Sequence, residues 1–393
     1  MTVRYGSVCS GIEAATAAWA PLGWEPAWFS EIEPFPKAVL MHLYPDVPDL
    51  GDMNGIEQGI QEGRIEAPDI LVGGCPCQAF SVIGARKSLD DERGALTLTY
   101  VRLANAIDDV RFVQGRRGCI TVWENVPGVL GTKDNAFGCL LGALAGEDVA
   151  LEPPGKRWTD AGFVFGPKRS IAWRCLDARF LGLAQRRKRV FVVSGPRDWF
   201  RANEVLFECG GGERNATQGG EKGQETSTGP GEGPQDGSGG QSMMPVLPFD
   251  TTQVTCPNNY SAPRFGDPCH PLAATAHPPA VAYGCDLSQK AEGIGYTKEI
   301  SPCVAPGTHP GHGSHVVVPS KMVVRRLTPE ECEALMGFSR GYTRIPWKGK
   351  PAEECPDGPR YAAIGNSMAV PVMTWIGRRI DEHLQRSAVC SPG

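Results

Sequence analysis

Apolar runs of strand length alternate with helix-length amphipathic segments over the first two hundred residues. The strand-like runs are 5–8, 25–29, 70–72, 119–123 and 190–193, with a hairpin-like pair at 163–165 and 171–175. The helix-like segments between them include 13–20, 36–42 and 94–112. Such alternation is typical of an α/β fold with a mainly parallel sheet. We therefore predict a doubly wound, Rossmann-like nucleotide-binding domain.

The composition changes abruptly after this region. Residues 209–241 are dense in Gly, Glu, Gln, Ser and Thr, which cannot form a core and predict a flexible insertion. Residues 243–318 are rich in Pro, His, Cys and Gly with short β-prone runs, so we expect a small, irregular, β-rich domain. Ordinary α/β composition then returns and ends in a predicted helix at 370–384. The predicted division is a main domain, 1–195 with 322–393, and a smaller domain, 196–321.

Composition and charge exclude several classes of protein. With 41% hydrophobic and 21% charged residues, the chain is globular rather than disordered or fibrous. No apolar run approaches the ~18 residues that span a bilayer, and the N-terminus lacks a secretory pattern, so we expect a cytoplasmic protein with no membrane partner. Its 14 cysteines are expected to be reduced thiols. Although the net charge is −5, residues 151–200 hold eleven basic against four acidic residues, an excess that suits phosphate binding or a solvated face.

A glycine turn and two acidic residues follow the first three predicted strands. The turn over residues 7–13 contains Gly11, and Glu31 ends the second strand. A glycine turn lets a cofactor approach the backbone, and an acid at the next strand end can accept hydrogen bonds from ribose hydroxyls. Asp52 is a candidate for an adenine contact. The alternative for each acid is an exposed loop position.

Two glycines and a Cys-Pro-Cys-Gln run, residues 75–78, follow the predicted strand at 70–72. Open α/β sheets place their active sites at the carboxyl ends of strands, so Cys77 is a candidate nucleophile. Two other interpretations are an inert loop cysteine and a metal or redox pair of Cys75 with Cys77. No second pair at zinc-like spacing lies nearby, which disfavours a closed metal site.

Charged residues mark two further strands. Glu124 ends the strand at 119–123, on the rim predicted to carry Cys77, and is a candidate acid or a solvated residue. Arg187 and Arg189 alternate at the start of the strand at 190–193, so both can face one site. The alternative for the arginines is phosphate binding.

Taken in order, these motifs resemble the cytosine-C5 DNA methyltransferases of bacteria and phages. The motifs that carry the resemblance are Ser10-Gly11, Glu31, Asp52, Pro76-Cys77-Gln78 with Phe80-Ser81, Glu124-Asn125-Val126, Gln185-x-Arg187-x-Arg189, residues 326–338 and Gly365-Asn366-Ser367. They cover residues 5–195 and 322–385. The chain departs from the family at Cys9, where an aromatic residue is usual, at Glu13-Ala14, where glycine is common, and at Cys75.

The resemblance implies a covalent mechanism on cytosine. Cys77 would add to C6 and make C5 nucleophilic, Glu124 would protonate or hydrogen-bond N3, and Arg189 would hold O2. Arg187 would support the loop or a phosphate. The other catalytic positions implied are Gln78, Ser81 and Asn125.

The resemblance also implies S-adenosylmethionine as cofactor. Glu31 would bind its ribose, Ile32 would pack on adenine, and Asp52 and Met53 would lie near the adenine edge. The other cofactor-binding positions implied are Cys9, Ser10, Gly11, Ile12, Pro76, Asn366 and Ser367.

Double-stranded DNA is the implied substrate, with the target cytosine flipped out of the stack. Residues 196–321 would then be the target-recognition domain and 1–195 with 322–393 the catalytic domain. We expect a monomer, and the resemblance also allows a cognate restriction endonuclease as partner. No metal is expected, because the Cys and His residues between 256 and 315 fit no standard finger spacing.

Three rival hypotheses remain: an RNA cytosine methyltransferase, a catalytically inactive DNA-binding relative, and a methyltransferase acting on a small molecule or protein. The presence of Cys77, Glu124 and Arg189 argues against inactivity. The motif around Cys77 together with Glu124-Asn125 argues against the third class.

Overall fold

The computed structural model describes residues 2–75, 92–207, 246–249, 280–283 and 324–389. Four of the predicted site residues lie outside these ranges: Pro76, Cys77, Gln78 and Ser81. Most of the predicted Gly-rich insertion and smaller domain also lies outside them.

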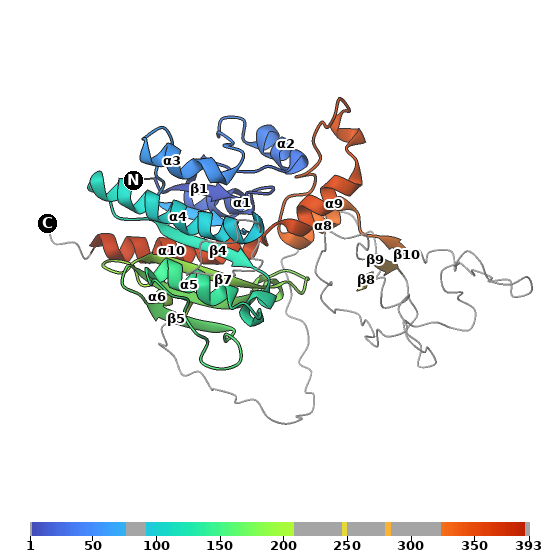
Figure 1. Ribbon diagram of the computed structural model, residues 1–393. Coiled ribbons are helices and arrows are strands. Elements are labelled where there is room, and N and C mark those ends of the chain that lie inside the picture. The colour runs from blue at the N-terminus through green and yellow to red at the C-terminus, as the bar shows by residue number, and fades with distance from the viewer. Residues whose placement is uncertain (1, 76–91, 208–245, 250–279, 284–323, 390–393) are drawn as a thin grey trace, which may run out of the picture.

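A seven-stranded sheet forms the centre of the molecule (Figure 1). Its strands are β1 (Arg4–Val8), β2 (Glu25–Trp28), β3 (Ile70–Gly73), β4 (Ile120–Asn125), β5 (Ala161–Phe165), β6 (Arg169–Asp177) and β7 (Lys188–Pro196). They lie in the order β2-β1-β3-β4-β7-β6-β5. The pairs β2-β1, β1-β3 and β3-β4 are parallel, whereas β4-β7, β7-β6 and β6-β5 are antiparallel. The sheet is therefore more evenly mixed than the predicted, mainly parallel one.

Helices cover both faces of this sheet, as predicted for a doubly wound fold. They are α1 (Ala14–Trp19), α2 (Pro34–Leu43), α3 (Ile56–Gln61), α4 (Glu92–Val113), α5 (Ala136–Ala145), α6 (Ala202–Leu206), α8 (Pro329–Met336), α9 (Asp357–Asn366) and α10 (Val370–Val389). Short 3-10 turns are η1 (Ala20–Leu22), η2 (Met53–Gly55), η3 (Pro127–Gly131), η4 (Ala178–Leu181) and η5 (Ala352–Glu354).

The alternation of side chains along each strand builds two cores. On β3, Ile70 and Val72 face a core shared with α1, α6 and α10, whereas Leu71 faces a core shared with α3, α4 and α5. A strand that is covered by helices on both faces of the sheet has apolar residues at every position. This is why the strand at 70–72 was predictable. The two cores make a three-layer α/β/α body.

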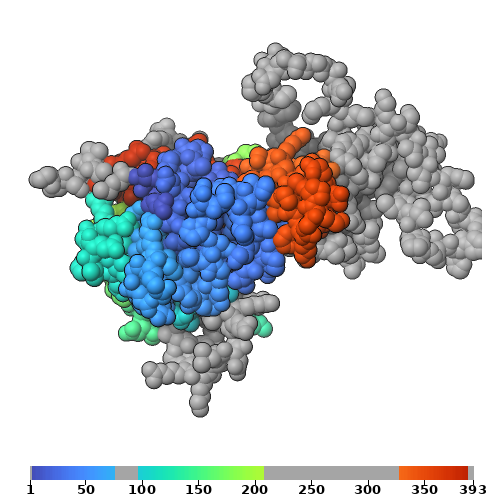
Figure 2. All heavy atoms as spheres, turned by 90° about the horizontal axis from the view of Figure 1, so that it is seen from above, coloured from blue at the N-terminus to red at the C-terminus, as the bar shows by residue number. Residues whose placement is uncertain are grey.

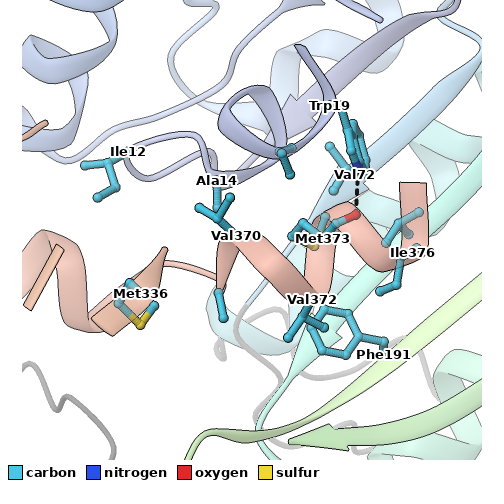
Figure 3. Close-up of a cluster of buried hydrophobic side chains, with 14 of the residues drawn as sticks. Ile12, Ala14, Trp19, Val72, Phe191, Met336, Val370, Val372, Met373 and Ile376 are labelled. Atoms are coloured by element: carbon cyan, nitrogen blue, oxygen red, sulfur yellow. Dashed lines mark hydrogen bonds between the residues drawn. The ribbon is translucent and has the colours of Figure 1, made fainter. Parts of the chain in front are cut away.

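The C-terminal helix completes the first core. Figure 3 shows α10 beside α1, where the indole Nε1 of Trp19 donates to the carbonyl oxygen of Met373 at 2.8 Å. Arg379 on α10 donates to the carbonyl oxygens of Val205 and Phe207, at 3.0 and 2.7 Å, where α6 ends. Residues 327–389 are therefore part of the same body as the first two hundred.

A second contact joins the chain's two ends. Figure 2 shows the orange surface of the segment around α8 and α9 against the blue surface of the N-terminal region. The hydroxyls of Tyr44 and Tyr342 lie 2.8 Å apart, and the Phe35 and Trp347 rings meet edge to face at 5.3 Å between centroids. The C-terminal segment thus helps to form the rim of the sheet.

Two observations bear on the predicted domain division. Residues 196–207 were assigned to the smaller domain, but Phe200, Val205 and Leu206 are fully buried in the first core, so the main body extends through α6. A separate three-stranded antiparallel sheet contains β8 (Val246–Phe249), β9 (Ala280–Tyr283) and β10 (Val324–Arg326), in the order β10-β9-β8.

No helix in the described ranges has both the length and the apolar character needed to cross a membrane.

Candidate active site

The turn after β1 is built from residues in left-handed backbone conformations. Cys9, Gly11 and Glu13 have φ values of 49°, 57° and 61°. The Glu31 carboxylate, which follows β2, accepts hydrogen bonds from the backbone amides of Gly11 at 2.6 Å and Ile32 at 2.8 Å. Glu31 therefore ties together the turns that follow β1 and β2 and fixes the backbone on which a cofactor would rest.

A cleft of about 430 Å³ opens beside these two turns. Its lining residues are Cys9, Gly11, Ser30, Glu31, Ile32, Glu33, Pro36, Gly51, Asp52, Met53, Gly74, Leu96, Ala363 and Asn366. The volume lies in the range of small-molecule sites, about 300–1,000 Å³. The cleft brings together seven of the predicted cofactor-binding residues.

The part of the cleft lined by Ile32, Asp52 and Met53 suits an adenosine. The Ile32 side chain is 68% exposed, an unusual degree for isoleucine and one that an aromatic base could cover. Asp52 caps η2 by accepting from the amide of Asn54 at 3.0 Å, and this cap holds the buried Met53 in place. An acid fixed beside apolar surface can accept hydrogen bonds from a bound base or sugar, so the residues present fit the predicted cofactor.

A smaller cavity of about 50 Å³ adjoins the cleft on the side of β4. It shares Cys9, Gly11, Gly74 and Asn366 with the cleft and is also lined by Ser7, Ser10, Glu13, Ala14, Ala15, Val72, Glu124, Ser367 and Met368. Ser10 and Ser367, two further predicted cofactor residues, are therefore placed here. The cavity therefore lies between the cleft and Glu124.

Ile12 departs from the prediction. Its side chain is fully buried in the first core, where Figure 3 shows it among the other apolar side chains, and it does not line the cleft. Its neighbours Cys9 and Gly11 line the cleft, whereas Ile12 packs in the core. The contribution of Ile12 is to anchor the turn.

Glu124 forms an ion pair at the carboxyl end of β4. Its Oε1 lies 3.2 Å from Nε of Arg189, and the two side chains are 12% and 19% exposed. Burial raises the pKa of the Glu124 carboxyl above its usual range, and the positive charges of Arg187 and Arg189 oppose that shift. The site therefore presents a carboxyl that can hold a proton next to a fixed positive charge.

Arg187 takes a different position from Arg189. It is 3% exposed and donates through Nη2 to the carbonyl oxygens of Gly365 and Ser367, at 3.1 and 2.5 Å. Burial, reinforced by Arg189 and opposed by Glu124, lowers the pKa of Arg187 to about 10, so it stays charged at neutral pH. The prediction that both arginines face one site is thus modified: Arg187 holds the turn after α9 against β7.

Gln185 acts in the same way two residues earlier. Its Nε2 donates to the carbonyl oxygen of Leu335, near the end of α8, at 2.9 Å. Of these three alternating residues, Gln185 and Arg187 thus hold the C-terminal segment, and Arg189 supplies a charge to the site.

Asn125 anchors the segment that leads to the predicted nucleophile. Its Nδ2 donates to the carbonyl oxygen of Cys75 at 3.0 Å, and its Oδ1 accepts from the amide of Val126 at 2.8 Å. Cys75 is the last described residue before Cys77. The geometry gives Asn125 a positioning task rather than a direct contact with the cleft.

Sequence reasoning assigned no role to two residues of the site. Glu13 is 1% exposed and caps α1, its Oε2 accepting from the amide of Thr16 at 3.1 Å. Gly74 leaves room for Glu124, because a Cβ there would lie 3.2 Å from Oε2 of that carboxylate. In the sequence, Glu13 could have been identified by its departure from the family pattern. Gly74 could have been identified by its place just after β3.

Among the described residues, no cluster of His, Cys, Asp and Glu could hold a metal ion. The Cys and His residues between 256 and 315 lie outside the described ranges.

Comparisons with known proteins agree with this architecture. Residues 3–205 match the family model C-5 cytosine-specific DNA methylase. The chain is 40% identical to DNA N-6-adenine-methyltransferase of Escherichia phage P1, over 98% of this chain and 61% of that protein. It is 24% identical to Type II methyltransferase M2.BsuMI of Bacillus subtilis (strain 168), over 96% of this chain and 75% of the relative. The S. pombe Dnmt2 methyltransferase structure aligns with a TM-score of 0.53 and 12% identity, covering 97% of this chain and 99% of that one.

The fold and the cleft define a Rossmann-like methyltransferase, for which S-adenosylmethionine is the expected cofactor. The chain belongs to the C-5 cytosine-specific DNA methylase family. It spans 61% of the length of its phage P1 relative.

Proposed function

We propose that this protein transfers a methyl group to C5 of a flipped-out cytosine in duplex DNA. The observation that carries the proposal is the ion pair of Glu124 and Arg189, which stands on the strand rim beside the cofactor cleft. The anchoring bond from Asn125 to Cys75 fastens the segment leading to Cys77 next to that pair. A proton donor and a cation thus lie at the edge of the sheet from which the chain continues to Cys77.

Cytosine C5 is too weak a nucleophile to be methylated unaided. In our proposal the Cys77 thiolate adds to C6, the C5–C6 double bond is saturated, and the ring becomes an enamine that is nucleophilic at C5. A free thiol has a pKa of about 8.5, so positive potential near the site is needed to favour the thiolate. Loss of the C5 proton after methylation would re-form the double bond and expel Cys77.

The Glu124 carboxyl would supply a proton to cytosine N3 as the thiolate adds. The raised pKa of this carboxyl keeps it protonated to a higher pH than an exposed glutamate, which suits a donor role. Arg189 would hold the cytosine O2 while it balances the charge on Glu124. Arg187 would act through its hold on the turn at Gly365 and Ser367.

S-adenosylmethionine, when bound, supplies an electrophilic methyl group. Glu31 and Ile32 would hold its adenosine in the larger cleft, with Asp52 and Met53 near the adenine. Ser10, Gly11, Asn366 and Ser367 would line the route toward Glu124. We propose that the body formed by residues up to 207 and from 327 onward is catalytic and that target recognition resides between them.

The name of the phage P1 relative makes adenine N6 the second candidate target. That amine carries its own lone pair, so its methylation needs no thiol adduct. Only 61% of the relative aligns with this chain, and the named activity is that of the longer protein. The Glu124–Arg189 pair suits the cytosine ring and favours C5 of cytosine.

The decisive experiment incubates the purified full chain with radiolabelled S-adenosylmethionine and unmethylated duplex DNA. The product is then sequenced at base resolution for 5-methylcytosine and N6-methyladenine. We expect 5-methylcytosine at a defined set of sites and no product from a Cys77→Ser variant. A duplex carrying 5-fluorocytosine at those sites should trap wild-type protein covalently, because fluorine cannot leave as the C5 proton does.

The control is Cys75→Ser, which changes the neighbouring thiol and keeps the proposed nucleophile. N6-methyladenine in place of 5-methylcytosine would overturn the proposed target. Label in RNA alone would change the substrate and keep the chemistry. A folded, cofactor-bound protein that labels neither nucleic acid would favour an inactive binding relative.

A further inference from the structure

Three sulfur atoms meet at the wall of the cofactor cleft. The Sγ atoms of Cys9 and Cys75 lie 3.7 Å apart, and Sγ of Cys75 lies 3.9 Å from Sδ of Met53. The parallel pairing of β1 with β3, which sets Val8 opposite Gly73, brings the two turns that carry the thiols side by side. The cluster therefore follows from the sheet register.

The two thiols differ in access. Cys9 is partly exposed and lines both the cleft and the smaller cavity, whereas Cys75 is fully buried. Neither thiol is among the residues that the proposed transfer reaction uses as a nucleophile. An exposed thiol in contact with a buried one is the arrangement of an attacking and a resolving cysteine.

We propose that Cys9 and Cys75 form a reversible disulfide that closes the cofactor site under oxidation. The inference rests on the family's cofactor and is independent of which base receives the methyl group. Occupation of the cleft would cover Cys9, so the cofactor and the oxidant would compete for the same turn.

The reaction is balanced with a peroxide as oxidant. The Cys9 thiolate attacks one peroxide oxygen, the O–O bond breaks, and a sulfenic acid and water result. The Cys75 thiolate then attacks the Cys9 sulfur, the S–O bond breaks, and a second water leaves. The two thiols lose two electrons and two protons, and the peroxide is reduced to two waters.

Disulfide formation requires the sulfur atoms of Cys9 and Cys75 to move closer together. A disulfide bond is about 2.05 Å long, so the sulfurs must approach by well over an ångström. The Cys75 backbone is held through its carbonyl oxygen by Asn125. The displacement therefore falls on the Cys9 turn, where the Gly11 amide is bonded to Glu31. Cofactor binding should weaken as a result.

Thermodynamic linkage makes the effect reciprocal. If the disulfide weakens cofactor affinity by about tenfold, saturating cofactor disfavours the disulfide by the same factor. For a two-electron couple that factor appears as a shift of about 30 mV in the reduction potential of the thiol pair, toward less negative, more oxidising values.

The test uses the full chain in a Cys77→Ser background, which removes the proposed nucleophile from competition. The protein is treated with hydrogen peroxide, its disulfides are mapped by peptide mass spectrometry, and its affinity for S-adenosylmethionine is measured by calorimetry. We expect a Cys9–Cys75 linked peptide, an affinity weaker by about tenfold, and full recovery with dithiothreitol. Prior saturation with the cofactor should slow formation of the linked peptide.

The matched control adds Cys75→Ser to the same background and compares each protein with its own untreated sample. Cys9 of this control can still form a sulfenic acid but no disulfide, so peroxide should lower the affinity of the control by less than that of the background protein. The proposal is overturned if no Cys9–Cys75 peptide forms, if the control loses affinity equally, or if wild-type chain links Cys77 to either thiol instead. Each result is read without measuring methylation, so it is separate from the test of the proposed function.

Discussion

The carboxyl of Glu124 is subject to two opposing influences. Removal from water favours its neutral form, whereas the charges of Arg187 and Arg189 favour the carboxylate. Burial is the larger of these effects, and the pKa is raised on balance. Arg187 is 3% exposed and its Nη2 donates to the turn after α9, whereas Arg189 forms the ion pair with Glu124. A proton held beside a fixed cation suits a site that must polarise a neutral ring.

Asn125 offers a test of how the loop that carries Cys77 is positioned. An Asn125→Ala variant loses both the bond to the Cys75 carbonyl and the bond from the Val126 amide. We expect kcat to fall by about tenfold to a hundredfold, because small misplacements of a reacting group have effects of that size. The KM for S-adenosylmethionine should change little, since Asn125 does not line the cofactor cleft. Steady-state methylation kinetics provide both values.

Asn125→Asp is the matched variant. It keeps an oxygen to accept from the Val126 amide but sets a carboxylate against the Cys75 carbonyl in place of a donor. If the bond to Cys75 is the one that matters, the aspartate variant loses as much kcat as the alanine variant. Wild-type kcat in the aspartate variant would contradict the positioning role.

At the scale of elements, α1 depends on an unusual cap. The helix has only six residues, too few to be stable alone, and its N-cap Glu13 adopts a left-handed conformation with φ 61°. The Glu13 side chain accepts from both the amide and the hydroxyl of Thr16, at 3.1 and 2.7 Å. The cap is satisfied, but the carboxyl is fully buried, and burial raises the pKa of Glu13.

This burial predicts a pH dependence of stability. A carboxyl whose pKa is raised in the folded state binds its proton more tightly there than in the unfolded chain, where the value is 4.5. Its contribution is fully present below 4.5 and is lost as the pH rises through the raised folded value. A Glu13→Gln variant carries no such proton, so its melting temperature should exceed that of wild type at about pH 7.5 and match it at about pH 4.

Scanning calorimetry at the two pH values measures this difference. The exposed Glu353→Gln substitution serves as control and should give the same small change at both. A Glu13→Gln variant that is less stable than wild type at neutral pH would contradict the argument, because the cap would then require the charge.

The elements themselves were largely predictable because their signals are local. The apolar run of β3 and the amphipathic pattern of α10 identify each element from its own residues. In the antiparallel half of the sheet, the hairpin of β5 and β6 was predicted, but the pairing of β7 with β4 and β6 was not, because the alternation of side chains does not specify a strand's neighbour. Likewise, Ile12 belongs to a motif but points into the core.

The hydrogen-bond partners of the motif residues could not be predicted from the sequence for the same reason. Gln185 bonds to a carbonyl 150 residues away and Arg187 to one 178 residues away. Spacing predicted that these side chains matter, and it predicted chemistry for Glu124 and Arg189. It could not separate a residue that holds the C-terminal segment from one that faces a substrate, because that depends on contacts made only in the folded chain.

At the scale of the whole molecule, the main body consists of two pieces of chain that are remote in sequence. Hydrogen bonds join them, including the buried bond from Trp19 to the Met373 carbonyl and the partly buried bonds from Arg379 to the end of α6. The apolar core beneath α10 includes Val372, Ile376 and Ile380, each no more than 2% exposed. Burial of such side chains contributes roughly 1.5–3 kcal/mol each, so the interface does not need a covalent link.

The two fragments of a cleaved chain should therefore stay associated. A protease site placed within residues 209–241, where the Gly-rich composition suits cleavage, would divide the protein into an N-terminal and a C-terminal fragment. We expect the fragments to co-elute in size-exclusion chromatography and to bind S-adenosylmethionine within about twofold of the uncut chain, because the cleft takes residues from both. Calorimetric titration of the cut complex gives the affinity.

An Arg379→Ala variant tests this association further. The Arg379 side chain donates to three carbonyl oxygens of residues 204–207, which lie in the other fragment. Cut Arg379→Ala protein should dissociate at a lower urea concentration than cut wild type, because three partly buried carbonyl oxygens lose their donor. Both uncut chains should elute as one species, which separates loss of association from loss of folding. Dissociation of cut wild-type fragments in the absence of urea would instead mean that the connection through residues 208–323, and not the packing of α10, holds the cofactor cleft together.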